Sequence, residues 1–405
     1  MTTMQRASRV LVSAVAGLLI GAGSAAAQGS NFVAPATADP QAAAGWSLTP
    51  SIGYSGAWDD NVLVRGNGDL PAEDFVSMIN PRGALNFNGR RSQLSGSYDG
   101  TFELYRELST LNSYDQRASL FAQRLLSPHV ALFGRSSLAK VPTTELSTFV
   151  GVPFLRTGSR LIDGRGGIDV AFTKRTSAVV SYNLEWVEFD HSVPGSENLQ
   201  GGHSQGASAS LRHDVDARLT LTGDYNFIHA NVVAVNQAFD IQNWWGGAEY
   251  KLSENSHISG AAGVSRLGVT ELTEARVGPA LRAGVVRNFR TAALSVQYSQ
   301  SFVPAYGFGG TMQNQELSGR LQAPLARRVV ASTGVAWRRN DPLTQIDPPL
   351  RSFWLEGSVG YAVTPLVRIE GFFAATRQTI NRPGGETDRN RFGFQVITAK
   401  PMRIQ

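Results

Sequence analysis

The sequence Gly45-Trp-Ser-Leu-Thr-Pro-Ser-Ile-Gly-Tyr-Ser-Gly-Ala-Trp-Asp59 alternates between two kinds of residue. One register is apolar or glycine and consists of Trp46, Leu48, Pro50, Ile52, Tyr54, Gly56 and Trp58. The other register is small or polar. Because successive side chains of a β-strand point to opposite faces, this period of two predicts a strand between an apolar and a wet environment. Aromatic residues at both ends of the apolar register are typical of a strand that crosses a bilayer.

The rest of the chain repeats this unit. We count about eighteen alternating segments in all, and an even number from about 16 to 20 fits the pattern of a transmembrane barrel. The clearest segments lie at 79–87, 94–104, 178–186, 219–227 and 353–361, and weaker ones at 113–126, 129–140, 240–252 and 313–323. Many are longer than the usual strand of ~5–6 residues and approach the length of a tilted membrane crossing.

The connections between these segments alternate in length. Those at 60–74, 141–158 and 190–202 are long, whereas those at 88–91 and 173–175 are tight. Long loops on one side and short turns on the other are typical of an up-and-down barrel. The sequence therefore predicts an all-β protein, a closed antiparallel transmembrane barrel of about 18 strands, that forms one domain over residues 45–405.

The first 27 residues have the pattern of a signal peptide. Arg6 and Arg9 precede an apolar run at 10–20, and three alanines at 25–27 provide a cleavage site. The alternative is a membrane anchor, but the apolar run is shorter than the ~20 residues that a spanning helix needs. Residues 28–44 are rich in Ala and Pro and are predicted to form a flexible leader. Export and a barrel together predict the bacterial outer membrane.

The polar register carries many charges that a packed interior would not tolerate, so this face is predicted to be wet. The candidate lumen-lining residues are Arg82, Asp99, Glu103, Arg117, Arg135, Asp163, Arg165, Asp169, Glu185, Arg212, Asp224, Arg282, Glu316, Arg320, Arg338, Glu356, Arg368 and Glu370. A soluble stacked β-fold would also have one wet face. The long strands and two aromatic belts, with Trp58 and Trp186 near the loops and Trp46 and Phe172 near the turns, favour the membrane barrel.

Acidic and basic residues nearly balance in this register, and two interpretations follow. A polar lumen without a dominant charge suits neutral or zwitterionic solutes, sugars among them. Alternatively, the charges form cross-strand ion pairs that stiffen the barrel and confer no selectivity. Five aromatic residues fall in the same register and could stack on sugar rings or pack against an inward-folded loop: Tyr105, Phe121, Phe133, Trp245 and Trp354.

The amino-acid composition excludes several kinds of binding partner and site. The chain has no cysteine, which excludes a lipidated N-terminus, disulfides and thiolate metal sites. Its formal charge of +5 is small for 405 residues, and we predict no nucleic-acid partner. The expected partners are outer-membrane lipid and lipopolysaccharide, the barrel-insertion machinery and, for an export function, a polysaccharide. No cofactor is predicted.

Candidate chemical sites are few. His191-Ser192 and His203-Ser204, with Asp190 and Glu197 nearby, are the rim candidates for a hydrolase. Asp59-Asp60-Asn61 with Asp69, Glu73 and Asp74 could supply oxygen ligands to calcium. For both groups solvated loop residues are the favoured interpretation, so no catalytic or metal residue is assigned and the protein is not predicted to be an enzyme. The glycine runs 164–167 and 307–310 open no helix and are not phosphate loops.

Short motifs resemble those of the β-barrel porin 2 family: Leu48-Thr-Pro-Ser-Ile52 with Trp58-Asp-Asp-Asn-Val62, Asp115-Gln116, Arg124-Leu-Leu-Ser-Pro128, and Pro142-Thr-Thr-Glu145. The resemblance covers Gly45 to the C-terminus. It implies an outer-membrane barrel, in a family often associated with exopolysaccharide production, and it assigns no catalytic residues. The chain departs from outer-membrane barrels that end on an aromatic residue, because its last aromatic is Phe394. This departure predicts either a short periplasmic tail or a degenerate insertion signal.

The favoured function is therefore passive, porin-like passage of solutes or of a secreted polysaccharide. The alternative is a non-conducting barrel that displays its long loops for adhesion or envelope assembly.

Overall fold

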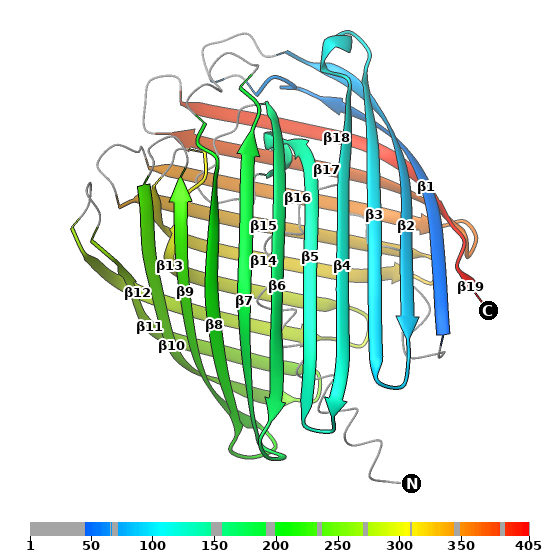
Figure 1. Cartoon of the computed structure of the whole chain (residues 1–405). Helices are drawn as coiled ribbons and strands as arrows, with labels where there is room; N and C mark the ends of the chain where they lie inside the picture. The colour runs from blue at the N-terminus through cyan, green and yellow to red at the C-terminus, as the bar shows by residue number, and fades with distance from the viewer. Residues whose placement is uncertain are drawn as a thin grey trace.

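The computed structural model describes residues 45–64, 66, 72–146, 156–191, 199–232, 237–269, 274–307, 310–343, 349–380 and 385–404. The predicted signal peptide (1–27) and leader (28–44) lie outside these residues, so both assignments stay predictions. Nearly all of the described chain is β-strand (Figure 1). No helix within the described ranges is long and apolar enough to cross a membrane.

The elements follow one another along the chain in a single series. They are β1 (Gly45–Asp59), β2 (Asp74–Asn88), β3 (Ser92–Tyr105), η1 (Ser109–Leu111), β4 (Ser113–Ser127), β5 (Val130–Pro142), η2 (Thr143–Leu146), β6 (Gly158–Ala171), β7 (Thr176–Phe189), β8 (Gly202–Asp214), β9 (Leu219–Val232), β10 (Gln237–Ser253), β11 (Ser256–Leu267), β12 (Arg276–Asn288), β13 (Ala293–Pro304), β14 (Thr311–Ala326), β15 (Val329–Pro342), β16 (Leu350–Ala362), β17 (Val367–Ile380), β18 (Glu386–Ala399) and β19 (Met402–Ile404). The four weaker segments of the sequence pattern are the strands β4, β5, β10 and β14.

Each strand pairs antiparallel with its neighbours in sequence, and β1 pairs with both β2 and β18. The first and last long strands are joined over nine residue pairs, from Ser51 with Ala399 to Asp59 with Arg391. The sheet is therefore closed and has no free edge along this seam. The predicted fold, a closed antiparallel barrel of 18 long strands, is confirmed.

The long strands have the dimensions of a membrane crossing. They contain 12 to 17 residues. At ~3.3 Å per residue and a tilt of roughly 40°, a strand of such length spans the apolar core of a bilayer. Tight turns join the strands at the end where the chain enters β1, and the longer connections lie at the opposite end (Figure 1).

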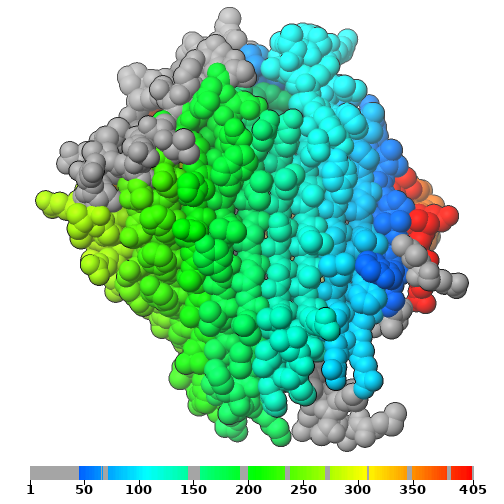
Figure 2. Space-filling model, viewed as in Figure 1, coloured from blue at the N-terminus to red at the C-terminus, as the bar shows by residue number. Residues whose placement is uncertain are grey.

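The outer surface carries the apolar register. Leu184 is 53% exposed, Val359 is 52% exposed and Ile52 is 51% exposed, and all three point away from the lumen. Figure 2 shows this wall as a continuous surface over the strands from β1 to β9. Large apolar side chains exposed on every part of a closed sheet are stable only against lipid. The protein is a bacterial outer-membrane β-barrel.

The C-terminus differs from the tail that the sequence suggested, whereas a degenerate insertion signal stays a prediction. Residues 397–399 belong to β18, and after Lys400 and Pro401 the short strand β19 continues along β1, pairing Met402 with Leu48 and Ile404 with Trp46. Pro401 has no N–H to donate, which explains the interruption between the two strands. The backbone N–H of Lys400 still donates to the carbonyl of Pro50 at 3.1 Å. The last residues therefore extend the closure of the barrel and do not form a loose tail.

Candidate functional site: the barrel lumen

A polar cavity of about 1100 Å³ occupies the inside of the barrel. Its lining extends from Val64 and Thr144 at the loop end to Asp169 and Ser295 near the turn end. Strands from β1 to β18 contribute to it, mostly through serine, asparagine and charged side chains. An 18-stranded barrel is wide enough to contain such a water-filled space, so the architecture is porin-like.

Fifteen of the eighteen candidate lumen residues line this cavity: Glu103, Arg117, Arg135, Asp163, Arg165, Asp169, Glu185, Arg212, Asp224, Arg282, Glu316, Arg320, Arg338, Glu356 and Glu370. The other three share the inward register of their strands. Arg82 forms an ion pair with Asp99 at 2.9 Å, and Arg368 forms one with Glu370 at 3.1 Å. A role of these residues in passage stays a prediction.

Many of the inward charges neutralise one another. Arg212 pairs with Glu249 at 2.8 Å, and Arg338 pairs with Glu316 at 2.7 Å. Most of these pairs connect different strands, so they fasten the wall from the inside. These pairs fit the interpretation that cross-strand ion pairs stiffen the barrel. They account for many of the lumen charges, but not for all of them.

A second layer of charge lies at the loop end. Arg156, which precedes β6, reaches β3 and pairs with Glu103 at 3.0 Å, and its guanidinium lies 4.9 Å from the ring centroid of Tyr105. Burial lowers the pKa of Arg156, but its contacts with Tyr105 and with the carboxylate of Glu103 outweigh that effect and raise the pKa overall. The connection before β6 is thus anchored inside the barrel.

Beside these charges, the inner face at the loop end carries buried apolar residues, which the pattern of polar residues did not predict. Three buried clusters lie there. One contains Val141, Leu161, Val187, Phe189, Leu199 and Tyr306; another contains Val232, Phe239, Ile241, Leu267, Phe302 and Leu343; the third contains Ala57, Val62, Val76, Met78 and Tyr105. Apolar side chains that point inward at the ends of strands need a covering, and inward-folded connections provide it.

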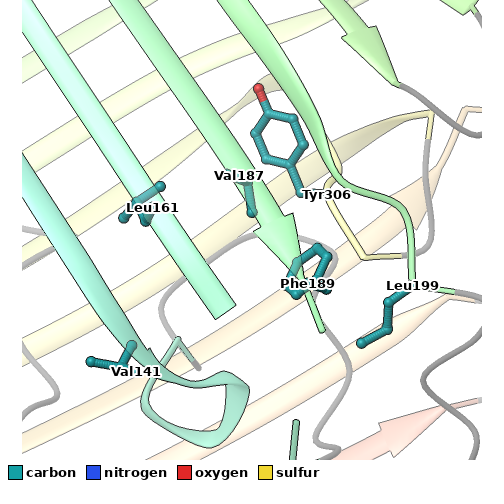
Figure 3. Packing of buried hydrophobic residues seen from close by; sticks show 6 residues of the cluster. All are labelled: Val141, Leu161, Val187, Phe189, Leu199 and Tyr306. Carbon is teal, nitrogen blue, oxygen red and sulfur yellow. The ribbon is translucent and has the colours of Figure 1, made fainter. Parts of the chain in front are cut away.

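One of these connections is the segment from Ser301 to Thr311, described except for residues 308 and 309, and we call it the strap. At its start, Phe302 is buried against β9 to β11, and its backbone N–H donates to the Ser265 hydroxyl at 3.2 Å. Further on, Tyr306 is buried against β5 to β7 (Figure 3). The strap therefore extends from β13 to the inner face of strands on another side of the barrel and narrows its outer end.

Backbone hydrogen bonds fix the strap in place. Gln200 and Gly307 form an isolated antiparallel bridge, with N–H to carbonyl distances of 2.8 and 2.9 Å. Gly307 has φ 101° and Gly310 has φ 84°, a left-handed conformation that glycine adopts without strain. Burial and the nearby charge of Glu185 raise the pKa of Tyr306, whose hydroxyl lies beside Glu185 and Ser204. Tyr306 is therefore neutral at any physiological pH.

The inward aromatic residues do not form an open track for sugar rings. The guanidinium of Arg282 lies 3.7 Å from the ring centroid of Trp245, and that of Arg338 lies 5.0 Å from the ring centroid of Trp354. One face of each indole is thus taken by a cation. Phe133 packs over Gly167, where an added Cβ would meet its ring at 2.8 Å. This contact explains one glycine of the 164–167 run, which lies within β6.

The described histidine candidate His203 is separated from its serine, and the described acidic candidates are held by other partners. His203 is exposed on the register of β8 opposite to that of Ser204, so the two side chains lie on different faces of the sheet. Ser192 and Glu197, and also Asp69, fall outside the described residues. Asp59 binds Arg389, Asp60 accepts hydrogen bonds from Asn390, and Asp74 accepts backbone N–H groups of Glu107 and Leu108. Within the described ranges, no group of three or more histidine or acidic side chains is placed to hold a metal ion.

Comparison with known proteins assigns the chain to no family. No family model and no curated protein matches the chain, so the resemblance to the β-barrel porin 2 family stays a prediction. Among solved structures, OccAB4 of Acinetobacter baumannii is similar at 8% identity and a TM-score of 0.47, over 90% of this chain and 100% of that one. OpdO of Pseudomonas aeruginosa is similar at 10% identity and a TM-score of 0.47, over 88% and 98% of the two chains. OccAB3 of Acinetobacter baumannii is similar at 11% identity and a TM-score of 0.45, over 88% and 99%.

Proposed function

We propose that the protein gives small polar solutes a passive route across the outer membrane through its lumen, and that the strap restricts this route at the outer end. The observation that carries the proposal is the cavity of about 1100 Å³ inside the barrel, lined by many charged and polar side chains, together with the packing of Phe302 and Tyr306 at its outer end. A barrel that served only as a membrane anchor would need no such polar interior.

The lining suggests weak selection by charge. Paired charges of both signs produce small fields, so neither cations nor anions are strongly excluded. Selection by size is then expected to be stronger, because the strap and the three apolar clusters reduce the open area at the outer end. Solutes larger than the remaining opening pass only when the strap moves aside.

Recordings from planar bilayers test this function. The refolded protein should produce discrete current steps with weak ion selectivity. Absence of steps at high protein dose, with folding verified by slower migration after heating, would contradict passage and favour the non-conducting barrel. The observation that favours a non-conducting barrel is the packing of the strap at the outer end.

Polysaccharide passage is the finer form of the proposal and has its own test. The strap packs against the inner wall at the outer end, so we expect export of a polymer to require its displacement. A deletion strain should then lose secreted polymer while small-solute uptake changes little. Unchanged polymer output would remove this form and leave the passage of small solutes untouched.

A further inference from the structure

Two neighbouring tiers of the lumen wall each contain two charges of the same sign. On β5 and β6, Arg135 is directly opposite Arg165. On β6 and β7, Asp163 is directly opposite Glu185. Asp163 and Arg165 are two residues apart on one face of β6, which places the tiers roughly 6.6 Å apart along the strand. All four side chains line the cavity.

Within the part of the chain that the structure describes, the arginine tier has no carboxylate partner. Arg165 donates to the hydroxyls of Ser181 at 2.9 Å and Ser208 at 3.4 Å, and Nε of Arg135 is buried without a hydrogen-bond partner. Among the described residues, neither guanidinium forms an ion pair, and the two charges repel each other. Like charges directly opposite each other on adjacent strands destabilise a sheet, so this pair costs the empty barrel free energy.

The acidic tier is arranged in the same way with the opposite sign. Asp163 accepts a hydrogen bond from the Ser137 hydroxyl, and Glu185 lies beside the Tyr306 hydroxyl and Ser204. The two carboxylates repel each other, and neither forms an ion pair with a described residue. This contrasts with four glutamates elsewhere in the lumen, since Glu249, Glu316, Glu356 and Glu370 each pair with an arginine.

We propose that Arg135, Arg165, Asp163 and Glu185 form a binding site for a zwitterion with a primary ammonium and a carboxylate, such as a short peptide. The carboxylate of the solute accepts hydrogen bonds from the two guanidinium groups, which favour that geometry. The ammonium lies between the two carboxylates, next to the strap residue Tyr306. Each end of the ligand relieves a repulsion that exists in the empty barrel.

This inference gives the proposed passage a substrate class, but its test does not depend on conduction. Equilibrium binding to the folded, detergent-solubilised protein is measured by calorimetry with three probes. Glycylglycine carries both charges, N-acetylglycylglycine only the carboxylate, and glycylglycinamide only the ammonium. We expect each singly charged probe to bind at least about tenfold more weakly than glycylglycine.

Variants then assign each charge to its tier. Arg165→Gln should abolish the preference for glycylglycine over glycylglycinamide, and Glu185→Gln should abolish the preference over N-acetylglycylglycine. The matched control is Arg160→Gln, which changes an exposed outward arginine of the same strand and should leave all three affinities unchanged. If a variant does not fold, the three probes on the unmodified protein still decide the question.

The zwitterion site would be overturned if either singly charged probe bound the unmodified protein as tightly as glycylglycine does. It would also be overturned if glycylglycine did not bind. Absence of current steps in bilayers together with selective binding of glycylglycine would contradict the proposed passage but support the binding site.

Discussion

At the scale of single residues, one buried ion pair spans the seam that closes the barrel. Asp59 at the end of β1 is fully buried, and its Oδ2 accepts a hydrogen bond from Nη2 of Arg389 on β18 at 2.5 Å. Nε of Arg389 lies 3.0 to 3.1 Å from both carboxylate oxygens, and Arg391 adds a second cation at 3.5 Å. These contacts join the first and last long strands where the loops begin.

Removing the charge of Asp59 should therefore weaken the seam. Asp59→Asn leaves Arg389 buried with its anionic partner lost, and we expect a loss of about 3–5 kcal/mol in the free energy of unfolding. Urea unfolding in detergent measures it. The control is Asp388→Asn, which breaks an exposed pair with Arg377 on the outer face and should cost at most about 1 kcal/mol. Equal losses would show that the seam does not depend on the buried pair.

At the scale of elements, the strap is the part of the fold that separates an open barrel from a restricted one. Tyr306→Ala removes the ring that packs against Val187 and Phe189 in Figure 3. We expect larger or longer-lived current steps in bilayers, because the strap loses its anchor on β5 to β7. Tyr361→Ala, which removes an exposed ring from the lipid face, is the control. A conductance that Tyr306→Ala leaves unchanged would mean that the strap does not limit passage.

A second prediction at this scale concerns the C-terminal strand β19. Deletion of residues 400–405 removes β19 and leaves Trp46 to Leu48 of β1 paired on one side only. We expect less folded barrel in the outer-membrane fraction, because an exposed strand edge invites mispairing. The fraction that migrates faster before heating measures this. A full yield of the truncated chain would show that β18 alone closes the barrel.

At the scale of the whole molecule, the outer face of the sheet contacts lipid and the inner face contacts water. Leu221 of β9 is exposed to lipid, whereas its neighbour Thr222 lines the cavity. Leu221→Arg should cost about 2–4 kcal/mol, since its charge enters the hydrocarbon layer, and Thr222→Arg should cost less because it enters water. Unfolding in lipid vesicles compares them. A larger loss for Thr222→Arg would contradict the assigned faces.

The sequence by itself determined the barrel. A period of two repeated over strands of 12 to 17 residues sets the outward and inward faces, and alternating connection lengths set the order of the strands. Both features are local, so Ile52, Leu184 and Arg165 could be assigned to their faces without knowledge of any partner.

Only the tertiary structure decided what fills the loop end of the lumen. Tyr306 meets Val187, and Arg156 meets Glu103, across many intervening residues, and nothing in the pattern near either residue identifies its partner. The same holds for the tiers of like charge, since whether Arg135 lies opposite Arg165 or a carboxylate depends on the register between β5 and β6. A slip of one residue would reverse every face. Alternation determines the side on which a residue lies, whereas register and loop packing determine which residues it meets there.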